Sequence, residues 1–403
     1  MKKWNVTERE SRGMGRRRAR MWQAALALAA MAWGCGGSGS GPSPTESAKP
    51  SAAAVSYMTA ALDIMQAHSI RRHEIDWESF RSGAMRSMGD AQTTSDTYPA
   101  LRQTITALGD HHSFLIAPSD ASALIARSNV STFVAPSSGS TLIASSNVST
   151  LMAPSNVSAQ GLPFGTGITA IDAQLLPPGI GYIYIPGTDD QGSDATAFAD
   201  ALQEAVENLD SSDPCGWVVD LRQNVGGNMW PMIAGIGPVL GEGDLGSFVD
   251  PDSVRSIWYY ADGAAGMRFP SGQKSVAAAV SDTAYKLAAV EPPPVAVLYG
   301  PYTASSGEAL AIAFRGRSLS RSFGEPTSGL STANATYPLS DGALLVLTVA
   351  TDVDRTGQIY GGELQPDQPV SWTTIEPTSV YDTAAAQAKE WLLAQSACED
   401  VAG

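Results

Sequence analysis

Histidine is scarce in this chain and is confined to one segment. There are four histidines in 403 residues, and all of them fall in the stretch from His68 to His112. His111 and His112 directly follow Asp110, but no cysteine or further histidine lies near them, so a metal site is not expected there. A histidine base for a catalytic group elsewhere would have to come from this segment. The alternative is that both are polar surface residues of a loop that ends a helix.

Cysteine is rarer still. The chain has three cysteines, and Cys35 follows an apolar segment near the N-terminus. In an oxidising compartment the other two, Cys215 and Cys398, are able to form one disulfide. Two buried thiols are the alternative, because the sequence does not give the separation of the two Cα atoms.

Positive charge is sparse outside the N-terminus. The chain has 25 basic and 40 acidic residues and a formal net charge of −15. The first 34 residues hold 8 of the basic and 2 of the acidic residues, which leaves 17 basic and 38 acidic residues and a charge of −21 in the rest. So acidic a protein is not expected to bind nucleic acid or anionic membrane surfaces through its charge.

The first 34 residues have the features of a signal peptide. A basic stretch, residues 16–20, precedes the apolar run from Met21 to Trp33, which is too short to span a bilayer. The run leads into A-W-G-C, which resembles a bacterial lipoprotein signal with Cys35 as the acylated first residue of the mature chain. A plain secretory signal or a true N-terminal helix is the alternative. Residues 35–55, rich in Gly, Ser, Pro and Ala, then form a flexible tether.

The rest of the chain divides into four regions. Helical spacing of apolar residues predicts a small N-terminal helical subdomain over residues 56–118. Residues 119–160 contain four similar nine-residue units, which are too few and too short for a solenoid and are interpreted as a low-complexity insertion without chemistry. Alternating strands and helices predict an α/β core over residues 161–380, and a C-terminal helix follows over residues 381–403.

The core elements are predicted from apolar runs and turn residues. The expected strands lie at residues 179–186, 217–221, 257–260, 295–299, 321–323 and 344–349. The expected helices lie at residues 195–209, 277–290, 308–314 and 382–397.

The stretch from Val295 to Ala313 carries the strongest candidate for chemistry. It predicts a buried strand, the turn T-A-S-S-G and the start of a helix. Such a turn holds a serine hydroxyl beside the free N–H groups of the helix start, which suits a nucleophile facing a developing oxyanion. The alternative is a plain capping box, in which Glu308 follows Ser305 by three residues.

A glycine-rich loop follows the strand predicted at residues 217–221. The loop runs R-Q-N-V-G-G-N over residues 222–228. Paired glycines let a backbone approach a ligand and expose its N–H groups, although an ordinary turn is the default interpretation of such a pair.

The order of these motifs resembles the C-terminal processing (tail-specific) serine peptidases, whose relatives include the tricorn protease core. The matching motifs are I-D-W at 75–77, L-G-D-x-H at 108–112, V-V-D-L-R-Q-N-V-G-G at 218–227, T-A-S-S-G-E-A at 303–309, G-E-P-T-S-G at 324–329, D-G-x-L-L-V-L-T at 341–348 and P-D at 366–367. The resemblance covers residues 56–397 apart from the repeats. It implies an α/β fold with a ClpP/crotonase-like peptidase core, preceded by helices.

The resemblance also implies the roles of individual residues. Ser305 falls at the position of the family's nucleophile, and the N–H groups of Gly226 or Gly227 and of Ser306 would form the oxyanion hole. The Ser–Lys branch of the family has a lysine where this chain has Leu330.

The tricorn-like branch uses histidine instead, which falls on His112. That branch has a serine just before this histidine, where the present chain has His111. A late glutamate orients its charge system, and Glu363 stands at a suitable place.

The sequence therefore predicts a serine endopeptidase that acts on envelope proteins or peptides through an acyl-enzyme on Ser305. It needs no metal or cofactor, contacts the membrane only through a lipid on Cys35, and lies in the cell envelope. The residue after Cys35 is Gly36 and not the aspartate that usually retains a lipoprotein in the inner membrane. The outer membrane is therefore favoured as the location of the anchor. The alternative is a non-catalytic binding module on the same fold, as in the related retinoid-binding proteins, and an esterase using the same serine is a third possibility.

Overall fold

The computed structural model describes residues 49–122, 170–289, 291–371 and 382–401. The expected signal peptide, Cys35, most of the tether and nearly all of the repeat insertion lie outside these residues. Within the described ranges no helix is both long and apolar enough to cross a membrane.

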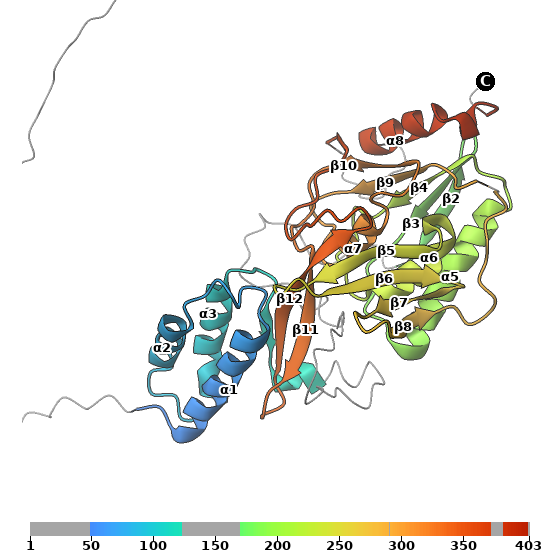
Figure 1. Ribbon diagram of the computed structural model, residues 1–403. Coiled ribbons are helices and arrows are strands. Elements are labelled where there is room, and N and C mark those ends of the chain that lie inside the picture. The colour runs from blue at the N-terminus through green and yellow to red at the C-terminus, as the bar shows by residue number, and fades with distance from the viewer. Residues whose placement is uncertain (1–48, 123–169, 290, 372–381, 402–403) are drawn as a thin grey trace, which may run out of the picture. The chain divides into compact units, whose positions relative to one another are not determined.

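The N-terminal region is mainly helical (Figure 1). It contains α1 (Ala52–His68), α2 (Trp77–Ser87) and α3 (Tyr98–Leu108), and a single 3-10 turn, η1 (Ser95–Thr97), precedes α3. The Ser51 hydroxyl caps α1 and the Asp76 carboxylate caps α2, each by accepting an N–H of the first turn. Gly109 ends α3 with a left-handed φ of 74°, a conformation that glycine adopts without strain. The predicted helical subdomain is confirmed, with α1 beginning at Ala52, inside the stretch expected to be a tether.

A six-stranded sheet forms the base of the core. Its order is β13 (Gln368–Pro369), β10 (Ser320–Gly324), β9 (Val295–Tyr299), β4 (Gly216–Asp220), β3 (Ile180–Tyr184) and β2 (Asp172–Leu176). All neighbouring pairs are parallel except β2 and β3. Strands β3, β4 and β9 are fully buried, as expected for parallel strands covered on both faces.

Helices cover both faces of this sheet (Figure 1). Alternate strand residues such as Val219 and Val297 pack with α5 (Gly192–Asp210), α6 (Met229–Leu240) and α7 (Ser306–Ala313). Their neighbours Val218 and Ala296 pack with α8 (Thr383–Leu393) on the opposite face. The α/β class predicted from the alternating pattern is therefore confirmed.

A second, antiparallel sheet stands beside the first. Its path is β1 (Phe114–Ile116), β12 (Leu344–Asp354), β5 (Gly243–Val249), β6 (Arg255–Ala261), β7 (Ala264–Arg268) and β8 (Lys274–Ala279), and β11 (Thr332–Pro338) also pairs with β12. Because β1 directly follows α3 and pairs with β12, it ties the N-terminal helices to the core. This pairing brings the D-x-H segment beside strands that are more than 200 residues later in the chain.

One secondary-structure prediction fails in the core, and one buried helix was not predicted. The helix expected at residues 277–290 is wrong, because residues 274–279 form β8 and no helix occurs in residues 280–289. Pairing of β8 with β7 outweighs the helical propensity of the alanines. Helix α6 was not predicted, because its two prolines, Pro231 and Pro238, and its two glycines are typical of a loop, yet it is almost completely buried.

The two remaining cysteines are bonded to each other. Cys215, which precedes β4, and Cys398, in the short 3-10 helix η3 (Ser396–Cys398), form a disulfide with a Cα–Cα distance of 5.0 Å. Of the two alternatives left open by the sequence, the structure therefore has the disulfide.

Candidate active site

Four loops meet where the parallel strands β3, β4, β9 and β10 end. The loop after β3 touches the loop after β4 through a bridge between Thr188 and Gly227. The Ala304 N–H, after β9, donates to the Asn224 carbonyl at 3.0 Å. The Ser328 N–H, after β10, donates to the Thr303 carbonyl at 3.0 Å. The carboxyl ends of parallel strands are the usual place for a ligand in such a sheet, so these loops form the candidate site.

Ser305 stands in this site in an unusual backbone conformation. Its φ is 52° and its ψ is −118°, and few non-glycine residues adopt such angles. The glycine loop approaches it closely, since a Cβ added to Gly226 would lie 3.0 Å from both the Ser305 Cβ and the Ser306 nitrogen. The strained turn is therefore held by packing and hydrogen bonds around it, and Ser305 is presented at the start of α7.

The carboxylate of Glu308 provides many of those hydrogen bonds. Its Oε2 accepts the N–H groups of Ser305 and Leu330, both at 2.8 Å. Its Oε1 accepts the Thr327 hydroxyl at 2.5 Å and the Gly329 N–H at 3.0 Å. The capping box considered from the sequence is thus present, but the same carboxylate also fixes the loop after β10. Glu308 joins the turn of Ser305 to the segment that leads into β11.

Glu308 is fully buried and has no cation beside it among its hydrogen-bond partners. Burial raises its pKa to about 7, while the donated hydrogen bonds oppose this rise. Asp352 lies near it in β12 and is also completely buried; burial and the charge of Glu308 raise the pKa of Asp352 well above its usual range. All four donors point at Glu308, so we place the negative charge there and the proton on Asp352.

The glycine loop offers one free backbone donor at this point. The Gly226 N–H is bonded to Asn224 Oδ1 at 2.9 Å. The Gly227 N–H has no acceptor among the described residues, whereas its carbonyl accepts the Ser306 hydroxyl at 2.6 Å. Of the two glycines considered from the sequence, Gly227 is therefore the one whose N–H remains available to a ligand.

Asn224 braces the same loop from behind. Its side-chain amide donates to the Ile185 carbonyl at 3.1 Å, which ties the loop to the end of β3. A Cβ on Gly307 would lie 2.4 Å from the Asn224 carbonyl oxygen, so glycine at 307 lets α7 start directly against this loop.

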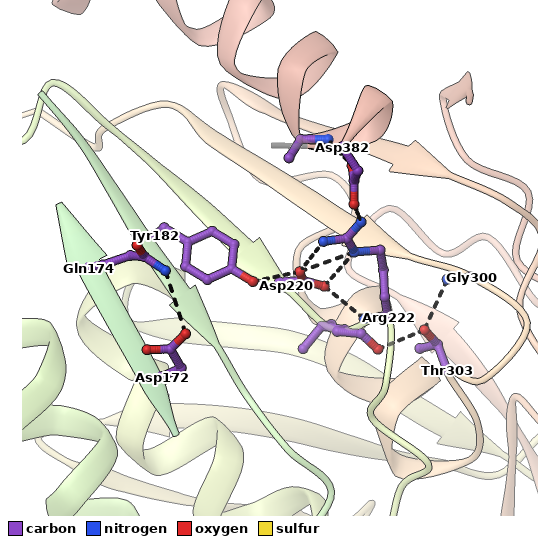
Figure 2. A network of polar contacts seen from close by, with 10 residues as sticks. Asp172, Gln174, Tyr182, Asp220, Arg222, Gly300, Thr303 and Asp382 are labelled. Atoms are coloured by element: carbon purple, nitrogen blue, oxygen red, sulfur yellow. Dashed lines mark hydrogen bonds and ion pairs between the residues drawn. The ribbon is translucent and has the colours of Figure 1, made fainter. Parts of the chain in front are cut away.

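A buried ionic cluster anchors the start of the loop (Figure 2). Arg222 is fully buried between Asp220, at the end of β4, and Asp382, and it pairs with both carboxylates. Asp382 also caps α8 by accepting the Ala385 N–H at 2.8 Å, and the Tyr182 hydroxyl donates to Asp220 at 2.7 Å. Paired charges of this kind hold their geometry tightly because separating them would leave a buried charge uncompensated.

Thr303 connects that cluster to the turn of Ser305 (Figure 2). Its hydroxyl donates to the Leu221 carbonyl at 2.8 Å and accepts the Gly300 N–H at 3.1 Å. The first residue of T-A-S-S-G therefore fixes the turn to the end of β4.

His112 approaches from the N-terminal segment. The Asp110 carboxylate accepts the N–H groups of His112 and Ser113 at 3.0 and 2.8 Å, which fixes the tight turn after α3. The Ser113 hydroxyl in turn accepts the Thr348 N–H of β12 at 2.9 Å. Asp110 thus shapes the D-x-H turn, and β12 holds the turn against the core.

The imidazole of His112 is buried and has one side-chain partner. Its Nδ1 lies 2.7 Å from the hydroxyl of Thr332, the first residue of β11. Burial lowers the pKa of His112 to about 4, while the charge of Asp110 opposes this shift. The ring is therefore neutral at pH 7, and with Nδ1 directed at Thr332, Nε2 is the nitrogen left for another group.

A short path of contacts joins Ser305 to His112. The Ser305 N–H and the Leu330 N–H share Glu308 Oε2. Leu330 is two residues before Thr332, and Thr332 bonds to His112. The structure thus brings the segments of both residues to the same end of the sheet.

The other expected residues are placed as follows. Glu363 is exposed, lies beside Gly329 and accepts a 3.5 Å hydrogen bond from Gln365, while the contact to His112 Nδ1 is made by Thr332. His111 is exposed, with a left-handed φ of 60°. Sequence reasoning assigned no role to Thr332 or Asn224. The i,i+3 spacing did mark Glu308 as a cap, but not as a link to the loop after β10.

The core of this chain is similar in sequence to known peptidases. Residues 179–370 match the model of peptidase family S41. A nisin-resistance protein of Lactococcus lactis subsp. lactis is 32% identical over 209 residues, which is 52% of this chain and 58% of that protein. Carboxyl-terminal-processing peptidase 2, chloroplastic, of Arabidopsis thaliana is 32% identical over 200 residues, 48% of this chain and 32% of that protein. The matched stretch thus spans between about a third and somewhat over half of these relatives.

Two solved structures share the fold. A lipoprotein from Streptococcus agalactiae superposes with a TM-score of 0.57 at 19% identity, covering 85% of this chain and 96% of that chain. The photosystem II D1 C-terminal processing protease superposes with a TM-score of 0.53 at 17% identity, covering 86% of this chain and 99% of that chain. These two similarities show the shared fold. The match to the family model identifies residues 179–370 as a domain of peptidase family S41.

Proposed function

We propose that this chain is a serine peptidase in which Ser305 is the nucleophile and His112 is the general base. The observation that carries the proposal is the path from the strained turn of Ser305, through Glu308 and Leu330, to the Thr332 hydroxyl that contacts His112. A turn held in an unfavourable conformation by a dedicated buried carboxylate is more than a helix cap requires.

The reaction begins with proton transfer from the Ser305 hydroxyl to His112 Nε2 as the serine oxygen attacks the peptide carbonyl carbon. The tautomer with a proton on Nδ1, donated to Thr332, leaves the lone pair on Nε2 for this task. The tetrahedral intermediate then expels the amine, which takes the proton from the imidazolium, and an acyl-enzyme on Ser305 remains. Water activated by His112 hydrolyses this ester and restores the serine.

The developing oxyanion would be bound by the N–H groups of Gly227 and Ser306. The Gly227 N–H has no acceptor among the described residues, and Ser306 is the first residue of α7, whose amide dipoles point toward the site. The hydrogen bond from the Ser306 hydroxyl to the Gly227 carbonyl would hold the Ser306 and Gly227 N–H groups close to each other. We also assign an orienting role to Glu363, which is exposed and lies beside Gly329.

We place this peptidase in the cell envelope, anchored by a lipid on Cys35, with envelope proteins or peptides as its substrates. The A-W-G-C motif supports the anchor, and the disulfide between Cys215 and Cys398 is consistent with an oxidising compartment.

Labelling of the purified chain with a fluorophosphonate probe tests the proposal. We expect the wild type to be labelled and Ser305→Ala to lose labelling completely. Loss of the base in His112→Ala should slow labelling by roughly 10³-fold or more. Ser328→Ala, an exposed serine on the neighbouring loop, is the matched control and should be labelled like the wild type.

The outcomes separate the candidates. Full labelling of His112→Ala would show that another group is the base. No labelling of a folded wild-type protein would replace the peptidase with a non-catalytic binding module on the same fold. Mass spectrometry of the membrane fraction tests the anchor independently, since Cys35→Ser should release the chain if Cys35 carries the lipid.

A further inference from the structure

A cleft lies at the other end of α7 from Ser305. It has a volume of about 670 Å³ and is bounded by the C-terminal end of α7, the start of β10 and the turn after β12. Because β13 pairs only with Phe323 and Gly324, the first residues of β10 form an open edge of the sheet at this point. Helix α7 has eight residues and is about 12 Å long, so this cleft is separate from the candidate active site.

Arginine dominates the cleft. Arg315, Arg317 and Arg321 line it. Arg355 lies next to these residues, since it donates to the Ala313 carbonyl at 2.7 Å and its charge acts on Arg317. Gly316 lets these segments pack together, since a Cβ there would lie 2.4 Å from Thr356 Cγ2 and 3.1 Å from Arg355 Cγ. These four arginines are among only 17 basic residues that follow position 34 in a strongly acidic chain. Such a concentration of positive charge is not explained by overall composition.

The two carboxylates in the cleft do not neutralise this charge. Asp367 pairs with Arg315 at 2.7 Å. Asp354 accepts the Tyr360 hydroxyl and the Thr356 hydroxyl, both at 2.7 Å, and backbone N–H groups of its own turn. In the described part of the chain, neither Arg317 nor Arg321 forms an ion pair with a carboxylate.

Arg317 is the clearest case. It is 9% exposed, and its guanidinium donates only to the carbonyls of Val239 and Ser318, at 3.0 and 2.8 Å. Burial and the nearby charge of Arg355 lower the pKa of Arg317 to about 10. The Nε atoms of Arg315 and Arg355 are also buried without an acceptor among the described residues. A buried cation without an anion is costly, so the site has unused capacity for negative charge.

We propose that this arginine cleft is a binding site for a small oxyanion, a phosphate or carboxylate group carried by a small molecule. The guanidinium fork matches the paired oxygens of both groups. Tyr360 and Trp391 also line the cleft and would flank the organic part of a larger ligand. The site does not depend on Ser305, and it would stand even if the peptidase proposal failed.

Calorimetric titration of the full chain with inorganic phosphate and with citrate, in a buffer low in chloride, tests the site. We expect at least one of the two anions to bind saturably. Arg321→Gln should weaken that binding roughly tenfold, because it removes one charge-assisted hydrogen bond donor. Arg268→Gln removes an arginine that pairs with Asp244 in a different part of the molecule, and it should leave the affinity unchanged.

Each result is decisive. Binding of phosphate alone assigns the site to phosphate esters, and binding of citrate alone assigns it to carboxylates. A peptide with a free C-terminal carboxylate, compared with its C-terminal amide, then tells whether the carboxylate comes from a peptide end. Absence of saturable binding by phosphate and citrate, or equal affinity in Arg321→Gln and the wild type, would overturn the proposal. Arg317→Gln is a second variant, which should also weaken anion binding. If Arg317→Gln does not fold, Arg321→Gln alone still tests the proposal.

Discussion

Ser305 and His112 lie at the same end of the sheet, but the protein holds them in different ways. The Ser305 turn is fixed by a buried carboxylate with four donated hydrogen bonds, by a glycine loop in contact with it and by the Thr303 hydroxyl. The His112 ring has one side-chain hydrogen bond, to Thr332. The serine side is therefore heavily constrained, while the orientation of the histidine depends on a single hydroxyl and on packing.

This difference follows from where each side comes from in the chain. The serine turn directly joins a buried strand to a helix, so most of its supports come from residues 220–228 and 303–330, within one sheet. His112 belongs to the N-terminal segment and is brought in by the pairing of β1 with β12. A residue supplied across such a long separation has fewer local partners, and its placement depends on the whole fold.

On the serine side, the largest effect after loss of Ser305 itself is expected from Glu308→Gln. An amide has one acceptor oxygen, and its NH₂ would face two of the four donors. We expect the free energy of unfolding to fall by roughly 3 kcal/mol and turnover to fall roughly 10²-fold as Ser305 shifts. Chemical denaturation and a peptidase assay measure both. Glu325→Gln, on the same loop as Gly329, is the control, and wild-type turnover in Glu308→Gln would show that the serine side is not held in this way.

A smaller effect is expected from Thr332→Val, which removes the hydroxyl from His112 while keeping the shape of the side chain. Without a partner on Nδ1 the ring is free to turn or to change tautomer, so kcat/KM should fall roughly tenfold. Thr332→Ser should restore most of the activity.

Thr336→Val is the matched control for this change. Thr336 lies on the same strand, and its buried hydroxyl has no partner among the described residues. Equal kcat/KM values for the two valine variants would mean that packing alone orients His112. The serine side would then be fixed by hydrogen bonds and the histidine ring by none.

The serine side could largely be predicted from the sequence because its signals are local. The apolar run before T-A-S-S-G, the cap spacing to Glu308 and the paired glycines at 226 and 227 all lie within a few residues of the features that they form. The positive φ of Ser305 and the second set of bonds made by Glu308 were not predicted, because they depend on the loop after β10.

The surroundings of His112 were much less predictable. The scarcity of histidine reduced the candidates to one segment, but Thr332 is 220 residues away, and nothing in T-A-N-A-T distinguishes its hydroxyl from that of Thr336. Contacts with distant residues also explain why β8 and α6 were not predicted. The local composition of each argues against the structure it adopts, and pairing with β7 stabilises β8 while packing with α5 stabilises α6.

The pH dependence of stability provides a test of how deeply His112 is buried. The native protein keeps His112 neutral down to about pH 4, while the unfolded chain protonates it near 6.5. Between these values the unfolded state binds more protons, so His112 makes the free energy of unfolding fall as the pH is lowered. The loss should approach roughly 3 kcal/mol near pH 4.

Glu308 contributes with the opposite sign, so the effect of His112 has to be isolated. The pKa of Glu308 is about 7 in the native state against 4.5 as its ordinary value, so the native state binds more protons between these values. Denaturation of the wild type and of His112→Gln across pH 4 to 7 separates the two, because only the difference between the proteins reports His112. A difference that does not vary with pH would contradict the deep burial of the imidazole.

The smallest effect on turnover is expected from the disulfide, although its effect on stability should be clear. Cys215 lies before β4, and the candidate site lies after it, so the five-residue strand separates them by about 16 Å. Replacing both cysteines by alanine should lower the free energy of unfolding by roughly 2–5 kcal/mol, because the bond closes a long loop in the unfolded chain. It should leave kcat/KM unchanged below the melting transition. A fall in kcat/KM at a temperature where the variant is fully folded would contradict this expectation. It would mean that a shift of the C-terminal helix reaches the glycine loop through the ion pair of Asp382 with Arg222. The serine side would then also depend on distant parts of the fold.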